Sequence, residues 1–412
     1  MKRNPALWTA PDEDEAARKN ELRLSAEPYA FPGVFRGGGY AWPGDFEGRA
    51  LLAFLCHCRI GGRKIPALTQ MMETLPEHAN KFLFIGDAPD GKTVNEQQLS
   101  GHNWYLRAMV EHARIFGDPL SEKAAESTFE HLFLPALPFY DRYPLERGKR
   151  DGGVDGHING EESGWLLSSD VGCAFMCADG VARYYALTGD TRAKVFLEKI
   201  FGVFLAADMV ARGFQTHTSL TCLRGMLCFY ESTGDKTYLQ AVIREFDRYL
   251  EYGMTLTYEN FNWFGREDTW TEPCAVVDSL LLAVRLYRLT GEDRYRTLAR
   301  RIRFNGLLFC QRENGGAGTN KCVTKDQPVL QINGYEATQC CTMRFAEGLL
   351  CIRENRELFF WDADAEIVTE PDGRRFCDDR LLVRVDGETR PIFSCNTYGK
   401  EDALALRLET LF

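Results

Sequence analysis

One stretch decides the fold class: Leu223–Leu250, which reads LRGMLCFYESTGDKTYLQAVIREFDRYL. Apolar residues recur at helical spacing on both sides of Thr233-Gly234-Asp235. Glycine readily ends a helix in the left-handed conformation, and a neighbouring Asp can cap the helix that follows. The stretch is therefore predicted to be a hairpin of two amphipathic helices.

The same unit recurs along the chain. Val277–Phe304 repeats it, with its turn at Thr290-Gly291-Glu292. The other copies have their turns at Phe116-Gly117-Asp118, at Thr188-Gly189-Asp190 and at Gly61-Gly62, and a last half-copy runs from Thr342 to Asn355. Spacings of about 45 to 70 residues predict five or six stacked hairpins.

Long irregular stretches separate the hairpins, at residues 135–168, 256–271 and 312–339. Loops of this length in a compact domain usually carry function, which favours a closed ring with an elaborated mouth over an open solenoid. The predicted fold class is mostly α: an (α/α)6 toroid or barrel with a short C-terminal β region. From Leu358 the pattern alternates and is rich in β-formers. We therefore expect a barrel domain over residues 1–357 and a small β-rich segment over 358–412.

Composition excludes several classes of protein. The net charge is −10, and the one dense basic cluster, at Arg300, Arg301 and Arg303, is typical of a helix surface. Nucleic-acid binding is not expected, because such binding needs a basic stripe. No apolar run approaches the length of a membrane span, and residues 1–19 lack the apolar core of a secretory signal. We expect a cytoplasmic protein with no membrane partner.

Among the fourteen cysteines, three have an unusual context. Glu272-Pro273-Cys274 directly precedes a strongly helical segment, and proline is favoured at the first helical position. Cys340 and Cys341 also stand directly before a predicted helix. Helix N-termini carry partial positive charge, which lowers the pKa of a thiol. The remaining cysteines lie mostly in apolar runs and are expected to be small buried hydrophobic residues.

One carboxylate and three thiols at two helix starts suit a tetrahedral zinc site. Glu272, Cys274, Cys340 and Cys341 are therefore candidate ligands of Zn²⁺. From spacing alone, an alternative stays open: buried or first-turn cysteines beside an unrelated capping Glu.

The Glu-x-Cys before one helix and the Cys-Cys pair before another resemble glycoside hydrolase family 127, the β-L-arabinofuranosidases and their relatives. The resemblance covers roughly residues 35 to 357 and is clearest over 215–345. It implies an (α/α)6 catalytic domain, the same four zinc ligands, and Cys340 as the nucleophile. It also implies a Glu acid/base, for which Glu259 in Tyr258-Glu259-Asn260-Phe261 is the nearest match. Glu267 is the second candidate.

Substrate contacts follow from the resemblance and from the loops. The family binds sugar hydroxyls through histidines at the mouth, where His102, His157 and His217 are expected. Trp263 and Trp270 lie in the loop that carries the Glu candidates, and sugars stack on such rings.

The predicted activity is retaining hydrolysis of a furanoside such as a β-L-arabinofuranoside, with a carbohydrate as the partner. A homo-oligomer is allowed for. Two departures leave the substrate range and oligomer contacts open: Thr342-Met343 replaces the family's Pro-Pro, and its large C-terminal β domains are missing. Two other functions stay open, a zinc-independent sugar-active enzyme (an unsaturated uronide hydrolase, epimerase or lyase) and a non-catalytic zinc-stapled helical scaffold.

Overall fold

Glycine turns join the helices in pairs, as the sequence predicts. The computed structural model describes residues 12–39, 42–147, 156–331, 336–385, 387–392 and 405–408. Left-handed glycines end five helices, with φ of 62° at Gly62, 61° at Gly117, 68° at Gly189, 74° at Gly234 and 72° at Gly291. The next helix is capped by the side chain of Asp118, Asp190 or Asp235 at three of these turns. Glu292 holds the same position but makes no capping bond with its side chain.

The chain forms two compact units, each described by itself. The first, called the α2–α10 unit, comprises Leu24–Gly253 and Asn262–Arg266. Its main helices are α2 (Asp45–Gly61), α3 (Pro66–His78), α4 (Glu96–Phe116), α5 (Pro119–Thr128), α7 (Cys177–Thr188), α8 (Thr191–Ala206), α9 (Thr216–Thr233) and α10 (Lys236–Tyr252). Shorter helical turns are η2 (Gly33–Gly39), η3 (Phe129–Phe133), α6 (Leu134–Ala136), η4 (Leu137–Arg142) and η5 (Cys173–Met176).

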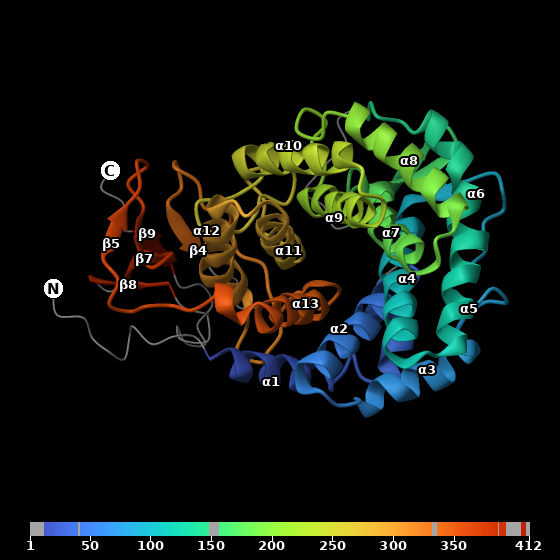
Figure 1. Cartoon of the computed structure of the whole chain (residues 1–412), viewed down its shortest axis with the longest axis horizontal. Helices are drawn as coiled ribbons and strands as arrows, with labels where there is room; N and C mark the ends of the chain where they lie inside the picture. The colour runs from blue at the N-terminus through green and yellow to red at the C-terminus, as the bar shows by residue number, and fades with distance from the viewer. Residues whose placement is uncertain are drawn as a thin grey trace. The chain divides into compact units, whose positions relative to one another are not determined.

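The first helices of successive hairpins form the inner layer of this unit. Helix α2 packs on α4, α4 on α7, and α7 on α9, while α5, α8 and α10 each pack on the preceding helix of their own hairpin (Figure 1). The inner helices are buried over most of their length, whereas α10 buries one face only. A small sheet with strand order β1-β3-β2 completes the unit, from β1 (Val94–Asn95), β2 (Ile158–Glu162) and β3 (Trp165–Ser168).

The second unit, called the α11–α13 unit, comprises Met1–Arg23, Met254–Phe261 and Glu267–Phe412. Its helices are α1 (Glu13–Leu24, whose last residue belongs to the other unit), α11 (Pro273–Thr290), α12 (Asp293–Arg301), the π-helical η6 (Ile302–Leu307), η7 (Leu308–Cys310), α13 (Cys341–Glu354) and η8 (Arg356–Leu358). Helix α11 contacts both α12 and α13, so it lies at the centre of the helical part of this unit.

The C-terminal residues form the predicted β region. Its strands are β4 (Val329–Gln331), β5 (Ile367–Thr369), β6 (Arg375–Cys377), β7 (Arg380–Val385), β8 (Glu388–Pro391) and β9 (Ala405–Leu408), in the order β4-β9-β7-β6-β5 with β8 paired to β7. All these pairs are antiparallel. Strand β4 precedes α13 in the chain, so the sheet also includes a segment from outside residues 358–412. The domain boundary between residues 357 and 358 remains a prediction.

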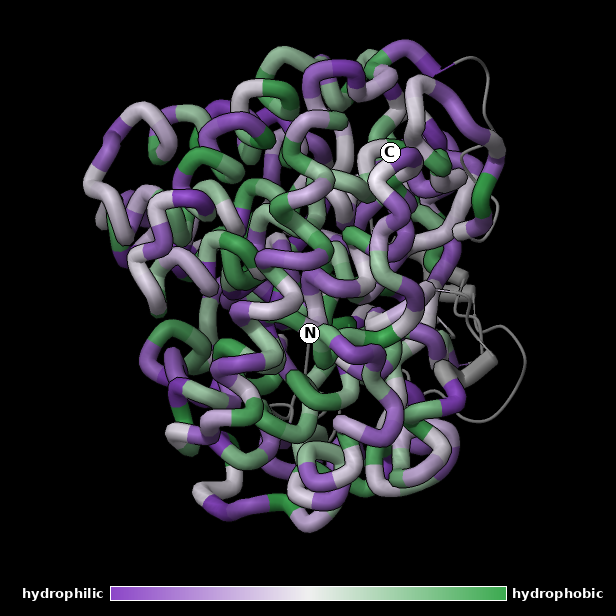
Figure 2. Tube along the Cα trace, turned by 90° about the vertical axis from the view of Figure 1, so that its right-hand side faces the viewer, coloured by the Kyte–Doolittle hydropathy of each residue, from purple (hydrophilic) through white to green (hydrophobic). Residues whose placement is uncertain are grey.

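Hydrophobic and hydrophilic residues alternate over short distances along the chain (Figure 2). This pattern is typical of amphipathic helices that bury one stripe. In the described part of the chain, none of the helices has the length and apolar character needed to cross a bilayer.

Candidate metal centre

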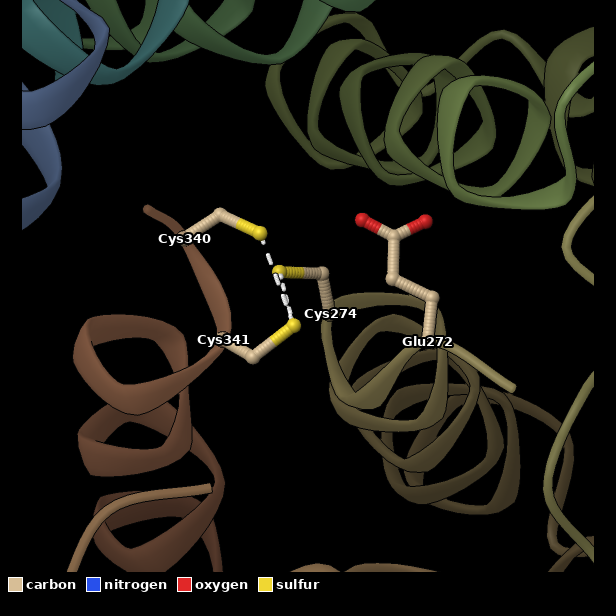
Figure 3. Close-up of side chains that lie close together, drawn as sticks. All are labelled: Glu272, Cys274, Cys340 and Cys341. Carbon is tan, nitrogen blue, oxygen red and sulfur yellow. Dashed lines mark hydrogen bonds between the residues drawn. The ribbon is translucent and has the colours of Figure 1, made fainter. Parts of the chain in front are cut away.

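Two helix starts in the α11–α13 unit bring four potential ligands together. Glu272 is the residue before the first turn of α11, Pro273 opens that helix, and Cys274 follows. Cys340 holds the corresponding position before α13, and Cys341 is the first residue of that helix. The three sulfur atoms converge, and the carboxylate of Glu272 stands beside them (Figure 3).

The distances within the cluster fit a single small cation. One ligand atom from each of the four residues lies within 4.8 Å of all the others. The Sγ of Cys274 is 3.7 Å from that of Cys341, which is 3.4 Å from that of Cys340. Sulfurs bound to one tetrahedral zinc at ~2.3 Å lie about 3.8 Å apart. The donor set and spacing therefore fit the zinc ion that the sequence predicts.

Burial distinguishes Cys340 from the other two cysteines. Cys274 and Cys341 are buried, at 0% and 1% exposure, whereas Cys340 is partly exposed. Burial raises the pKa of the Cys274 and Cys341 thiols well above the usual range, so both are neutral without a cation. A bound divalent cation reverses this, since a coordinated thiol is deprotonated. Of the three sulfurs, that of Cys340 is the one an external molecule can reach most easily.

A buried ion pair joins the two helices one turn beyond the ligands. Arg344 of α13 donates to the carboxylate of Asp278 in α11, and their side chains are 2% and 0% exposed. Each residue follows a cysteine of the cluster by four positions, Asp278 after Cys274 and Arg344 after Cys340. Residues four apart lie on the same helix face, so the pair fixes the spacing of the two ligand-bearing helix starts.

Glu259, the predicted acid/base, lies in a fully buried network of the same unit. Its carboxylate accepts hydrogen bonds from Thr257 Oγ1 (3.1 Å), Thr271 Oγ1 (3.0 Å) and Asn320 Nδ2 (2.8 Å). Burial raises its pKa, and these donors partly offset the rise. Glu267, the second candidate, is exposed.

The predicted substrate-binding residues divide between the two units. His102, His157, His217 and Trp263 belong to the α2–α10 unit, whereas Trp270 lies in the α11–α13 unit, two residues before Glu272. His102 is buried in α4, and burial lowers its pKa to about 4, so its ring is neutral. His217 stacks on Trp104 with ring centroids 5.6 Å apart, and His157 is exposed. Contact of these residues with a sugar remains a prediction.

Sequence reasoning missed the residues that support the ligands. The pairing of Asp278 with Arg344 could have been predicted from the sequence. Each is a charged residue four positions after a cysteine in an apolar helix, and the two charges are opposite. Asn260 lies outside the Glu272-Pro273-Cys274 motif, yet its Oδ1 accepts a hydrogen bond from the N–H of Glu272 at 3.1 Å. Asn320 lies in an irregular segment, where no periodicity marks it.

Comparisons with known proteins show the fold. No protein-family model and no curated protein sequence matches this chain. A solved GH127 β-arabinofuranosidase structure is 13% identical, with a TM-score of 0.52 over 91% of this chain and 63% of its own. A GH76 α-mannanase of Bacteroides thetaiotaomicron is 10% identical, with a TM-score of 0.54 over 86% and 99%. A sugar epimerase from a ruminal bacterium is 11% identical, with a TM-score of 0.50 over 82% and 98%.

The chain has a GH127-like glycoside hydrolase fold, and the (α/α)6 fold class predicted from the sequence is confirmed. It spans less than two thirds of the length of the GH127 structure that it matches. At these identities the likeness concerns the fold, and the site must carry the argument about function.

Proposed function

We propose that this protein is a retaining glycoside hydrolase that acts on a furanoside such as a β-L-arabinofuranoside, with Cys340 as the nucleophile. The observation that carries the proposal is the convergence of three cysteine sulfurs and one carboxylate. Among these three cysteines, only Cys340 is partly exposed. A cysteine that acts as a nucleophile must be reachable by its substrate, and of the three sulfur ligands only Cys340 meets that requirement.

The residues would divide the chemistry of a double displacement. A bound zinc ion would supply one property, the deprotonated state of the sulfurs at neutral pH. Glu272, Cys274, Cys340 and Cys341 would hold it, and Cys340, the partly exposed cysteine of the cluster, would present its sulfur to the substrate.

In the first step, Cys340 Sγ attacks the anomeric carbon while the glycosidic bond breaks. Glu259 gives its proton to the departing oxygen. In the second step, Glu259 takes a proton from water as that water attacks the same carbon. The carbon–sulfur bond then breaks, and Cys340 leaves as a thiolate. Two inversions give net retention.

The raised pKa of Glu259 supports its assignment as the acid, because a general acid must hold its proton near the working pH. Its bond to Thr271, the neighbour of Glu272, connects it to the metal ligands. Glu267 is the alternative acid/base, and its side chain is already exposed to solvent.

The test is a panel of aryl furanosides and pyranosides, assayed with wild-type protein and with Cys340→Ser. Turnover of one furanoside by the wild type, lost in the variant while its circular dichroism stays unchanged, is the expected result. Full activity of Cys340→Ser would remove the nucleophile assignment. Activity without bound metal would favour the zinc-independent enzyme, and metal without any turnover would favour the scaffold.

A further inference from the structure

The backbone of Glu272 is held from outside its own helix. A residue in this position usually caps the helix with its side chain, but Glu272 makes no side-chain capping bond to α11. Its N–H instead donates to Asn260 Oδ1 at 3.1 Å. Asn260 thus holds the main chain of Glu272 from outside α11.

Asn260 lies in the segment Met254–Phe261, called the Met254–Phe261 loop. This loop and Asn320 together hold Thr271, the residue before Glu272. Its Oγ1 donates to Glu259 and accepts from the N–H of Asn320 at 3.0 Å, while its own N–H donates to the carbonyl of Asn320 at 2.8 Å. Asn320 Nδ2 closes the network on Glu259. Two consecutive residues of the Met254–Phe261 loop therefore hold two consecutive residues before α11.

The loop itself has a strained backbone at Tyr258, whose φ is +62°. A bulky residue rarely adopts this conformation unless its surroundings impose it. The Tyr258 hydroxyl accepts from Arg301 Nη1 at 3.0 Å. The guanidinium of Arg374 lies 5.1 Å from its ring centroid, and Phe376 packs edge-on at 6.0 Å.

Two of these contacts come from the C-terminal β region. Phe376 is in β6, and Arg374 directly precedes that strand. Arg374 Nη1 also donates to the carbonyl of Leu256 at 2.8 Å, so one guanidinium holds the loop at its main chain and at the Tyr258 ring. A continuous series of contacts therefore leads from the β region, through Tyr258 and Asn260, to Glu272.

We propose that the Met254–Phe261 loop is a positioning element for the metal ligand Glu272, and that the C-terminal β region holds this loop through Arg374 and Phe376. Asn260 is the positioning residue that acts on Glu272. The proposal rests on the metal centre of the proposed function. It assigns a role to the β region: its strands keep a metal ligand in place, although no residue of it belongs to the cluster.

The experiment measures metal affinity of the full-length, chelator-stripped protein by competition with a zinc indicator. Substitution of residues that support metal ligands typically weakens binding 10–100-fold. We expect Asn260→Ala to weaken zinc binding at least tenfold, and Arg374→Ala to weaken it in the same direction by less. With Co²⁺ as the probe, sulfur-to-cobalt charge transfer should persist in Asn260→Ala, and the ligand-field bands should shift because the carboxylate is displaced.

Matched controls separate positioning from general loss of stability. Asn355 is also buried and bonds the end of α13, through Nδ2 to the Cys351 carbonyl. Asn355→Ala should lower thermal stability but leave zinc affinity unchanged. Arg384 is an exposed arginine of β7, and Arg384→Ala is the control for Arg374→Ala.

The outcomes are distinct. Wild-type zinc affinity in both Asn260→Ala and Arg374→Ala would overturn the positioning role alone. If Asn260→Ala does not fold, the zinc affinity and the cobalt spectrum of Arg374→Ala decide: an affinity and ligand-field bands like those of the wild type would overturn the positioning role. A wild-type chain that binds neither ion would overturn the metal centre and this inference with it.

Discussion

The carboxylate of Asp278 and the guanidinium of Arg344 meet in the interior, one helical turn beyond the cysteines at the starts of α11 and α13. Removing one partner leaves a buried charge, which typically costs about 3–5 kcal/mol. We expect Asp278→Ala to lose about 3 kcal/mol of unfolding free energy in urea, since Glu347 remains as a second partner of Arg344. Asp278→Asn, which keeps an acceptor, should lose less. Equal stability of Asp278→Ala and wild type would show that the pair does not fix the helices.

Zinc binding should release protons, because the raised pKa of the Cys274 and Cys341 thiols keeps both protonated in the metal-free protein at neutral pH. Displacing two protons makes affinity rise about 100-fold per pH unit. Binding should thus strengthen from pH 6.5 to 7.5, as measured by chelator competition, and Cys274→Ala should reduce the slope by about one proton. A slope near zero would mean that these sulfurs are not ligands.

Glu259 and Glu267 make different kinetic predictions. If Glu259 is the general acid, Glu259→Gln should slow hydrolysis of an alkyl furanoside by about 10²–10⁴-fold. It should slow a nitrophenyl furanoside much less in the bond-breaking step, because that leaving group needs little protonation. Glu267→Gln serves as the matched substitution and should leave both rates near wild type. The reverse pattern would transfer the role to Glu267.

Burial of Glu259 also predicts a pH-dependent stability. Its pKa is raised above the ordinary 4.5, so the folded state binds the proton more tightly than the unfolded chain. This contribution to stability is complete below about pH 4.5 and is lost as pH rises through the folded pKa. Glu259→Gln has no titrating carboxyl at this position and lacks this contribution. The unfolding free energy of wild type should therefore fall relative to that of the variant as pH rises. A constant difference from pH 4 to 8 would contradict the raised pKa.

The hairpin architecture could be predicted because it depends on residues that lie close together in the sequence. Gly234 ends α9 and Asp235 caps α10, and neither role needs a distant residue. The β region was predictable from alternation after Leu358, but its pairing with β4 was not, because Val329–Gln331 is short and lies in an irregular segment. Pairing between distant strands depends on tertiary contacts that periodicity does not encode.

The four-residue cluster was predictable for a similar reason: Pro273 marks a helix start, and Cys340 and Cys341 stand at another. Its support was not. Asn260 acts through one side-chain oxygen on the backbone of a residue twelve positions away, and Tyr258 adopts a conformation that its residue type does not favour. Such contacts exist only after the loop, α11 and the β region have come together.

A close contact at Gly306 tests that assembly independently. Gly306 lies in η6, and a Cβ there would come within 2.5 Å of the Tyr258 carbonyl oxygen. Since this is a backbone atom, Gly306→Ala must displace the loop, at a typical cost of about 1–3 kcal/mol. Gly202, in helix α8, is the control: a Cβ there meets nothing within 4 Å, so Gly202→Ala should stabilise by about 0.5–1 kcal/mol. Urea unfolding measures both changes, and the zinc affinity of Gly306→Ala should also fall, because the displaced Tyr258 carries Asn260 with it. Unchanged stability and unchanged affinity in Gly306→Ala would mean that the loop can move without disturbing Glu272.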